Sequence, residues 1–304
     1  MTSLPDGLTQ RPLVPADAAA VFETMAEEQL HDLGTVEIEL ADIVGDWQRP
    51  SFDITSRTVG VFDGERLVGY AEVSGRDRGE AAVRPAQRGR GIGTWLASWM
   101  QDCARTHGAD VVGMPVPQGS PGDRLLESLG YHVRWTSWVL QLPAGTAIAD
   151  RELPAGYTVG AASPDQYVAA HDVLEDAFLE WSERDREPYG DFEAGVLHRP
   201  GFAPWQLRVV TDEAGAVAAV AVVMLVPEGV GGQPEAYIDR LATRRDQRGR
   251  GLAQALMVDS FARAREHGAA TSSLSTDSRT GALGLYERVG MQVTSVWVNR
   301  AISL

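Results

Sequence analysis

Two short segments combine glycine with arginine in a pattern that suits phosphate binding. They are Gln87–Gly93 (QRGRGIG) and Gln247–Ala253 (QRGRGLA), each placed between a predicted strand and a predicted amphipathic helix. The first N–H groups of a helix have no intrahelical partner, and the helix dipole attracts an anion there. Glycine lets the backbone approach a ligand closely, and arginine adds a charge-assisted partner for phosphate. The chemistry indicated is the binding of a phosphorylated ligand.

Two familiar phosphate loops fit these segments poorly. The dinucleotide fingerprint G-x-G-x-x-G follows the first strand of a unit, whereas Gly89, Gly91 and Gly93 follow several predicted elements. The Walker A loop ends in lysine and then serine or threonine, and this chain contains no lysine. A plain strand-to-helix turn is the remaining alternative, and its occurrence twice at the same place argues against it.

The two glycine segments belong to an internal repeat. A shift of 160 positions superimposes them and also brings His107–Ala109 onto His267–Ala269. Each copy is predicted to contain a strand, helices, a hairpin, a strand leading into the glycine loop, and then helix, strand, helix and strand. We therefore predict an α/β fold of two tandem domains, residues 1–145 and 146–304, each with a mixed central sheet flanked by helices.

Composition and charge exclude several classes of function. The chain of 304 residues has a net charge of −15, which disfavours nucleic acid as a partner. It has no signal-peptide pattern and no apolar stretch of membrane-spanning length, so we expect a cytoplasmic protein without a membrane partner. Cys103 is the only cysteine and the six histidines show no ligand spacing, so we predict no disulfide and no metal site.

A second motif follows the second glycine loop. About 33 residues after the start of the predicted helix comes Leu285–Met291 (LYERVGM). Together with Arg248-x-x-Gly251-x-Ala253, this segment resembles the GNAT acetyltransferase superfamily, and the resemblance covers essentially the whole chain. The fusion of two copies is similar in layout to tandem acetyltransferases such as mycothiol synthase. The resemblance implies an enzyme that transfers an acetyl group from acetyl-CoA directly to a primary amine.

The resemblance also implies where acetyl-CoA, the co-substrate, would bind. The pyrophosphate would lie on the backbone of the second loop, and pantetheine would pair like an extra strand with the strand before it. In the second copy the implied residues are Leu241, Ala242, Thr243, Arg248, Gly249, Arg250, Gly251, Leu252 and Ala253. The counterparts that would form a second donor site in the first copy are Arg88, Gly89, Arg90, Gly91 and Gly93.

Tyr286 is the candidate proton donor. The resemblance implies this role, because a tyrosine at this place in the motif usually protonates the departing thiolate in the family. A shift of 160 positions places Leu126 at the corresponding position of the first copy, and leucine cannot donate a proton. The first copy is therefore predicted to be degenerate and the second to be catalytic.

The strand before the second loop offers two carboxylates as candidate bases. Its alternate residues, from Glu235 through Asp239 to Thr243, are predicted to share one face because side chains alternate along a strand. Either carboxylate could take a proton from the amine through water. The first copy has Gly75 and Gly79 at the corresponding positions. A solvated carboxylate without a catalytic role is the alternative for each.

The segment Phe178–Tyr189 (FLEWSERDREPY) is the candidate acceptor-binding region. Its carboxylates and aromatic rings suit a cationic amine, through charge pairing and cation–π attraction. The alternative is a solvated helix end with Trp181 packed on the core. We predict an amine on a small molecule or peptide as the acceptor, with a cationic amine as the sharper hypothesis. A noncatalytic acyl-CoA-binding or interaction protein is the alternative function, and the sequence does not determine the oligomeric state.

Overall fold

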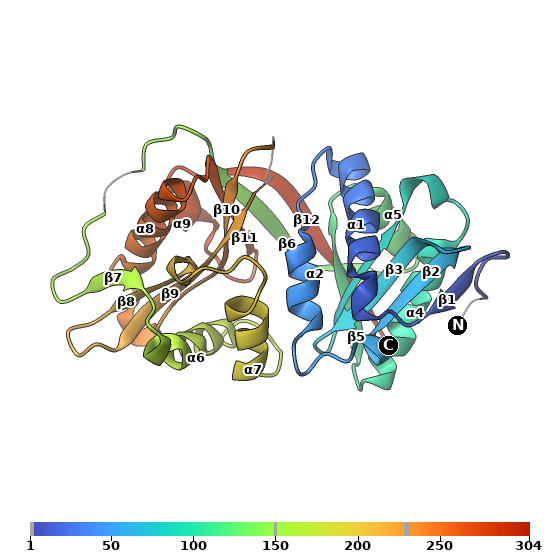
Figure 1. Cartoon of the computed structure of the whole chain (residues 1–304), viewed down its shortest axis with the longest axis horizontal. Helices are drawn as coiled ribbons and strands as arrows, with labels where there is room; N and C mark the ends of the chain where they lie inside the picture. The colour runs from blue at the N-terminus through green and yellow to red at the C-terminus, as the bar shows by residue number, and fades with distance from the viewer. Residues whose placement is uncertain (1–2, 149–150, 228–231) are drawn as a thin grey trace. The chain divides into compact units, whose positions relative to one another are not determined.

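The chain folds into two compact units (Figure 1). The structure is a computed structural model, and it describes residues 3–148, 151–227 and 232–304. The first unit comprises Met1–Ser137 with Val296–Leu304, and the second comprises Trp138–Ser295. Each unit has a mixed sheet with helices on both faces, which confirms the predicted α/β fold class.

The sheet of the first unit has the strand order β1-β2-β3-β4-β5-β12. Its neighbouring strands are antiparallel except for β4 and β5, which are parallel. The strands are β1 (Thr9–Arg11), β2 (Thr58–Asp63), β3 (Arg66–Ser74), β4 (Arg78–Val83), β5 (Val111–Pro117) and β12 (Gln292–Ser303).

Helices cover both faces of this sheet. The core on one face joins Val21 of α1 and Trp47 of α2 to Tyr70 of β3. The core on the other face joins Leu96 of α4 to Val61 of β2. The helices are α1 (Ala18–Leu33), α2 (Leu40–Trp47), α3 (Ile54–Arg57), α4 (Ile92–Thr106) and α5 (Pro121–Ser128).

The sheet of the second unit has the strand order β6-β11-β10-β9-β8-β7. Strands β7 to β10 pair antiparallel, whereas β10 and β11 are parallel. Most of β9 is buried and it pairs on both edges, which explains its unbroken apolar run of valine, alanine, methionine and leucine. The strands are β6 (His132–Leu142), β7 (Thr158–Ala161), β8 (Leu207–Thr211), β9 (Val217–Val226), β10 (Glu235–Thr243) and β11 (Thr271–Asp277).

Helices α6 and α7 lie on one face of the second sheet, and α8 and α9 lie on the other. Leu174 and Phe192 fill the core under the first pair, and Phe261 and Tyr286 fill the core under the second pair. The helices are α6 (Tyr167–Phe178), α7 (Tyr189–Phe192), α8 (Leu252–Glu266) and α9 (Leu283–Glu287). Across the described ranges, no helix combines the length and the apolar character that a membrane span requires.

The compact units do not coincide with the sequence copies 1–145 and 146–304. The last strand of each copy, β6 and β12, changes unit in mid-strand, between residues 137 and 138 and between residues 295 and 296. The second half of β12 pairs with β5 and completes the sheet of the first unit. A repeat in the sequence cannot reveal this exchange, because both copies end in a strand of the same kind.

Arg300 fixes β12 in the first unit. Its Nε donates a hydrogen bond of 2.7 Å to Asp123, and its NH1 donates to the backbone oxygen of Tyr131 at 3.3 Å. The Asp123 side chain is only 9% exposed; Arg300 is its ionic partner, and the Gly119 N–H donates to its other oxygen at 2.7 Å.

We expect Arg300→Met to lower the free energy of unfolding of the first unit by about 2–4 kcal/mol, because the buried carboxylate of Asp123 loses its partner. Hydrogen exchange of the β5 amides would measure the loss. The control Arg105→Met removes an exposed pair with Asp102 and should cost less than about 0.5 kcal/mol. Equal protection of β5 in the two variants would contradict this role of Arg300.

Candidate active site

The second glycine loop leads from the short turn Arg245–Gln247 into α8. Gly249 and Gly251 have φ angles of +77° and +81°, in the left-handed region that favours glycine. A Cβ on either residue would meet no described atom within 4 Å, so the backbone conformation and not crowding requires glycine here. The first N–H groups of α8 have no intrahelical partner, so this junction of loop and helix suits a pyrophosphate.

Strand β10 loses its parallel partner halfway along. Its pairing with β11 ends at Ile238↔Leu274, whereas its pairing with β9 continues to Thr243. One edge of the stretch 239–243 therefore has no register partner in β11. An extended ligand can hydrogen-bond to such an edge in the manner of an added strand.

A β-bulge interrupts β10 at Asp239. The register with β9 shifts between Ile238 and Arg240, and the alternation of faces reverses after the bulge. The predicted shared face of Glu235, Asp239 and Thr243 is therefore wrong: Glu235 and Arg240 lie on one face, and Thr243 lies on the other. The prediction assumed a strict period of two, which a bulge breaks.

Tyr286 projects from α9 and is 8% exposed. Burial raises the pKa of its hydroxyl above the ordinary value, and a hydrogen bond with Thr276 opposes this change only in part. Thr276 lies on β11, two residues beyond the last pair with β10. The Tyr286 hydroxyl is thus held at the strand segment that borders the open edge of β10, in its protonated form.

Glu235 lies at the end of β10 remote from the loop. It pairs with Thr271, five residues before Thr276 on β11, which corresponds to about 17 Å along the strand. Its carboxylate is buried and accepts a hydrogen bond from Ser273. The structure therefore does not bring Glu235 together with Tyr286, and its role as a base stays a prediction.

Asp239 lies beside the open edge of β10, at the bulge. It is exposed, and the Nε of Arg240 lies 3.3 Å from its Oδ2. The bulge comes directly after the last pair of β10 with β11. Of the two predicted carboxylates, Asp239 is therefore the one closer along the sheet to Thr276, which bonds to Tyr286.

A half-buried ion pair stands next to the bulge, and sequence reasoning missed it. Both terminal nitrogens of Arg240 donate to the carboxylate of Glu187, at 2.5 and 3.3 Å. The two side chains are 22% and 14% exposed, and the guanidinium also lies 5.8 Å from the ring centroid of Phe192. No local signal could have found this pair, because its members are 53 positions apart and belong to no shared motif.

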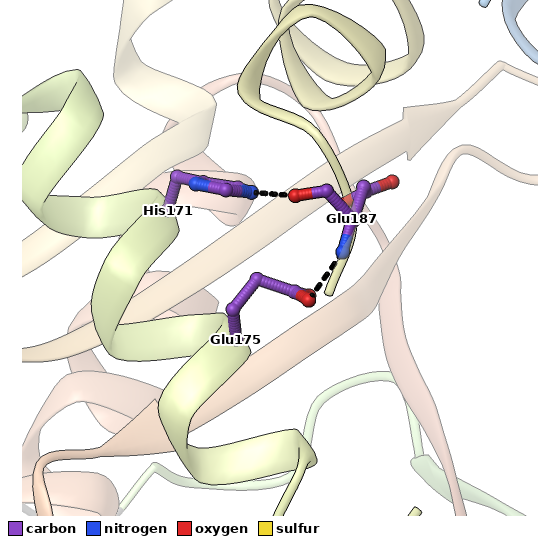
Figure 2. Close-up of side chains that lie close together, drawn as sticks. All are labelled: His171, Glu175 and Glu187. Carbon is purple, nitrogen blue, oxygen red and sulfur yellow. Dashed lines mark hydrogen bonds between the residues drawn. The ribbon is translucent and has the colours of Figure 1, made fainter. Parts of the chain in front are cut away.

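Figure 2 shows how the backbone of Glu187 is held. His171 Nε2 lies 2.9 Å from the Glu187 carbonyl oxygen, and the Glu187 N–H donates to Glu175 at 2.7 Å. Arg184 donates to both oxygens of Glu175. His171, Glu175 and Glu187 lie close enough together to hold a metal ion. In this structure, however, the His171 and Glu175 side chains bond to the backbone of Glu187. The Glu187 carboxylate is left to pair with Arg240.

The two arginines of the second loop differ in their contacts. Arg248 donates two hydrogen bonds of 2.8 Å to Glu180 and one of 3.1 Å to the backbone oxygen of Thr243. Arg250 is exposed, and it has neither a hydrogen bond nor an ion pair with any part of the chain that the structure describes. Arg250 is therefore the guanidinium available to a phosphate, whereas Arg248 links the loop to the segment after α6.

In the predicted acceptor region Phe178–Tyr189, a carboxylate and an aromatic ring contact arginine side chains of the same chain. Glu180 is paired with the loop, as described above. The guanidinium of Arg279 lies 4.8 Å from the ring centroid of Trp181 and also pairs with Asp277 at the end of β11. Two of the groups expected to attract a cationic amine, Glu180 and Trp181, are thus already in contact with arginines of the chain.

The first unit keeps the glycine loop but not the tyrosine. Gly89 and Gly91 have φ angles of +80° and +88°, close to those of the second loop. Leu126 is 4% exposed at the position that corresponds to Tyr286. Strand β4 pairs with β3 without any shift of register, so the bulge is also missing.

The side chains of the first loop have structural contacts. Arg88 donates to Asp32 of α1, and Arg90 donates to a carboxylate at the end of β2. A Cβ on Gly93 would lie 2.7 Å from Leu125 Cδ2, so this glycine permits the close packing of α4 against α5. Donor binding by this loop stays a prediction.

The sequence and structure are similar to those of known acetyltransferases. The sequence profile of the acetyltransferase (GNAT) family matches residues 22–131 and 167–291. A protein of Thermobispora bispora named mycothiol acetyltransferase is 28% identical over 252 residues, which cover 76% of this chain and 78% of that protein.

Solved structures share the fold over nearly the whole chain. A GCN5-related N-acetyltransferase from Sphaerobacter thermophilus matches with a TM-score of 0.76 and 26% identity, over 99% of this chain and 97% of that one. A tandem GNAT protein from the clavulanic acid biosynthesis pathway, solved without AcCoA, matches with a TM-score of 0.72 and 20% identity. That match covers 97% of this chain and 98% of the other, which supports a two-domain layout.

We expect Arg250→Met to weaken the binding of CoA about fivefold to tenfold, because one charge-assisted contact to phosphate is lost. Calorimetric titration with CoA would measure the change. The control Arg263→Met removes a partly buried arginine near the other end of α8 and should leave the affinity unchanged. If Arg250→Met bound CoA as tightly as the unmodified chain, the phosphate would lie elsewhere.

Proposed function

Because the chain belongs to the GNAT acetyltransferase family, whose members use acyl-CoA, we propose that it transfers the acetyl group of acetyl-CoA directly to a primary amine of a small molecule or peptide. We assign the chemistry to the second unit. One observation carries this assignment: the Tyr286 hydroxyl bonds to Thr276 beside the open edge of β10, and the first unit has Leu126 at the corresponding position.

The proposed donor site consists mainly of backbone. The pyrophosphate lies against Gly249, Gly251 and the first turn of α8, whose N–H groups have no intrahelical partner. Arg250 supplies the side-chain charge. The pantetheine arm runs along the open edge of β10 at Leu241–Thr243 and takes the hydrogen-bonding place that β11 leaves.

The proposed reaction is a single acyl transfer. The amine nitrogen attacks the thioester carbonyl, so that a C–N bond forms and the C–S bond breaks. Tyr286 donates its phenolic proton to the departing thiolate and regains one from solvent. The excess proton of the attacking amine passes through water to Asp239. A backbone N–H group of β10 stabilises the charge that develops on the carbonyl oxygen.

The proposed acceptor needs a primary amine, and its other groups are not assigned. A preference for a cationic acceptor rests on the exposed carboxylate of Glu183, since Glu180, Trp181 and Asp239 are in contact with arginines. The alternative function, noncatalytic acyl-CoA binding, is favoured only in the first unit, by Leu126. Turnover with any amine separates the two functions.

We expect Tyr286→Phe to lower kcat about a hundredfold or more while the affinity for acetyl-CoA stays nearly constant, because only the general acid is lost. The release of free CoA thiol, followed over a panel of amines and amino acids, would measure turnover.

The matched control is Tyr131→Phe, which removes a buried hydroxyl in the first unit that lies 3.2 Å from Gln101. Its kcat should stay within about twofold of the unmodified value, since Tyr131 has no part in the proposed chemistry. If Tyr286→Phe and Tyr131→Phe had the same turnover, the chemistry would not depend on Tyr286.

The pH dependence of kcat should reflect the raised pKa of Tyr286. An acid catalyst works while it is protonated, and burial keeps the Tyr286 hydroxyl protonated to a higher pH than an ordinary tyrosine. We therefore expect the midpoint of the alkaline fall in kcat to lie above the ordinary tyrosine pKa of about 10. A fall centred near neutral pH would show that another group supplies the proton.

A further inference from the structure

The proposed base Asp239 shares an arginine with Glu187. The Nε of Arg240 donates a hydrogen bond of 3.3 Å to the carboxylate of Asp239. The two terminal nitrogens of Arg240 donate to Glu187 at 2.5 and 3.3 Å, so the shortest of the three hydrogen bonds goes to Glu187. One guanidinium therefore bridges two carboxylates at the bulge of β10.

The positive charge of Arg240 affects how well its neighbour can act as a base. Burial lowers the pKa of Arg240, but the charges of Asp239 and Glu187 outweigh this effect and raise it above its ordinary value. The guanidinium therefore stays charged. A neighbouring cation lowers the pKa of a carboxylate by about one to three units, and a carboxylate of lower pKa is a weaker general base. Glu187 supplies the negative charge that opposes this effect.

Two buried side chains of α6 fix the position of Glu187. His171 Nε2 lies 2.9 Å from the Glu187 carbonyl oxygen, and the Glu187 N–H donates to Glu175 at 2.7 Å (Figure 2). Glu175 is fully buried, and Arg184 donates to both of its oxygens. Because its backbone is held at both the N–H and the carbonyl group, Glu187 presents its carboxylate to Arg240 from a fixed point. An ordinary surface ion pair has no such support.

The first copy lacks the base, its arginine and both side chains that hold Glu187. Corresponding positions are found by a shift of 160 in the strand and by aligning the first residues of α1 and α6, which is a shift of 149. The residues at these positions are Gly79, Glu80, Phe22 and Ala26. The copy with Leu126 in place of the tyrosine therefore lacks the whole set, as expected if the set serves the same reaction as Tyr286.

We propose that Glu187 is a positioning residue for the general base: it binds the terminal nitrogens of Arg240 and offsets their charge, so that Asp239 can accept a proton from the attacking amine. This inference rests on the proposed function, in which Asp239 is the base. As the C–N bond forms, the amine nitrogen becomes positively charged, and water passes its excess proton to Asp239, which later releases it to solvent. Glu187 and Arg240 stay ionised throughout and exchange no proton.

Charged groups on the neighbouring elements have partners of their own, so a change at Glu187 acts on Asp239 through Arg240. Strand β9 carries no charged residue. His171 of α6 is bonded to the backbone of Glu187. The pairs on α6, on β10 and at the end of β11 are Glu175 with Arg184, Glu235 with Ser273, and Asp277 with Arg279.

A carbon-13 NMR titration of the Asp239 carboxyl group, in the full chain without acetyl-CoA, tests the proposal. The signal is the one that Asp239→Asn removes. We expect Glu187→Gln to move the titration midpoint about one pH unit lower, because Arg240 keeps its charge and loses the opposing one. Glu187→Gln combined with Arg240→Met removes both charges and should bring the midpoint back. The matched control Asp259→Asn breaks another half-buried pair, with Arg208, and should leave the midpoint unchanged.

The pH dependence of kcat is the second readout. In the unmodified chain kcat should fall at low pH, as Asp239 becomes protonated. Glu187→Gln should lower the plateau of kcat about threefold to tenfold and move this fall to lower pH, while KM for acetyl-CoA stays constant, because the weaker base stays ionised to lower pH. The double variant should regain kcat to within about threefold of the unmodified value. A merely structural role predicts instead that the double variant is slower than Glu187→Gln.

The proposal is overturned if Glu187→Gln, shown by circular dichroism to be folded, has the same midpoint as Asp259→Asn, or if the double variant is slower than Glu187→Gln. A fall of kcat at low pH that persists in Asp239→Asn would overturn the assignment of the base, and the role of Glu187 with it. The NMR titration needs no turnover. A lack of turnover with every amine would therefore contradict the proposed function, whereas an unmoved midpoint contradicts only the role of Glu187.

Discussion

The open edge of β10 is the constraint on which the candidate active site depends. A parallel pair that stops at Ile238↔Leu274 leaves backbone N–H and C=O groups that need other partners. The bulge at Asp239 turns the strand at this point, and the loop and α8 follow directly from its end. The Tyr286 hydroxyl forms a hydrogen bond with Thr276 of β11, the strand on this side of β10. In the proposed function, a thioester donor held by the backbone of this edge therefore has the buried Tyr286 phenol on its other side.

Arginine holds the surroundings of this edge in place. The chain has no lysine, so apart from histidine every positively charged side chain is an arginine. The planar guanidinium of arginine can donate two hydrogen bonds to one carboxylate. Arg184 does this to Glu175, Arg240 to Glu187 and Arg248 to Glu180. The first pair ties the segment after α6 back to α6, and the other two connect this segment to β10 and to the loop. Because their charges are matched, that segment has little charge left for an acceptor.

The two copies show how one fold carries different sites. Both keep the glycines with positive φ, because the turn from strand to helix needs them whatever the ligand. Side chains that the backbone does not require have diverged: Leu126 stands where the other copy has Tyr286, and Glu80 where it has Arg240. The fold is a property of the pattern, whereas the chemistry is a property of single residues.

The sequence by itself determined the α/β class, the repeat, the two glycine loops and the contrast between Tyr286 and Leu126, because each is recorded in local pattern or in a fixed shift along the chain. Tertiary structure alone decided the bulge, which a strict two-residue period cannot contain, and the exchange of β6 and β12 between units. It also decided which loop guanidinium has no partner among the described residues, since a partner such as Glu180 lies 68 positions from its arginine. Ion pairs between residues so far apart in the sequence depend on which strands and helices become neighbours in the fold. The types of the side chains do not predict this.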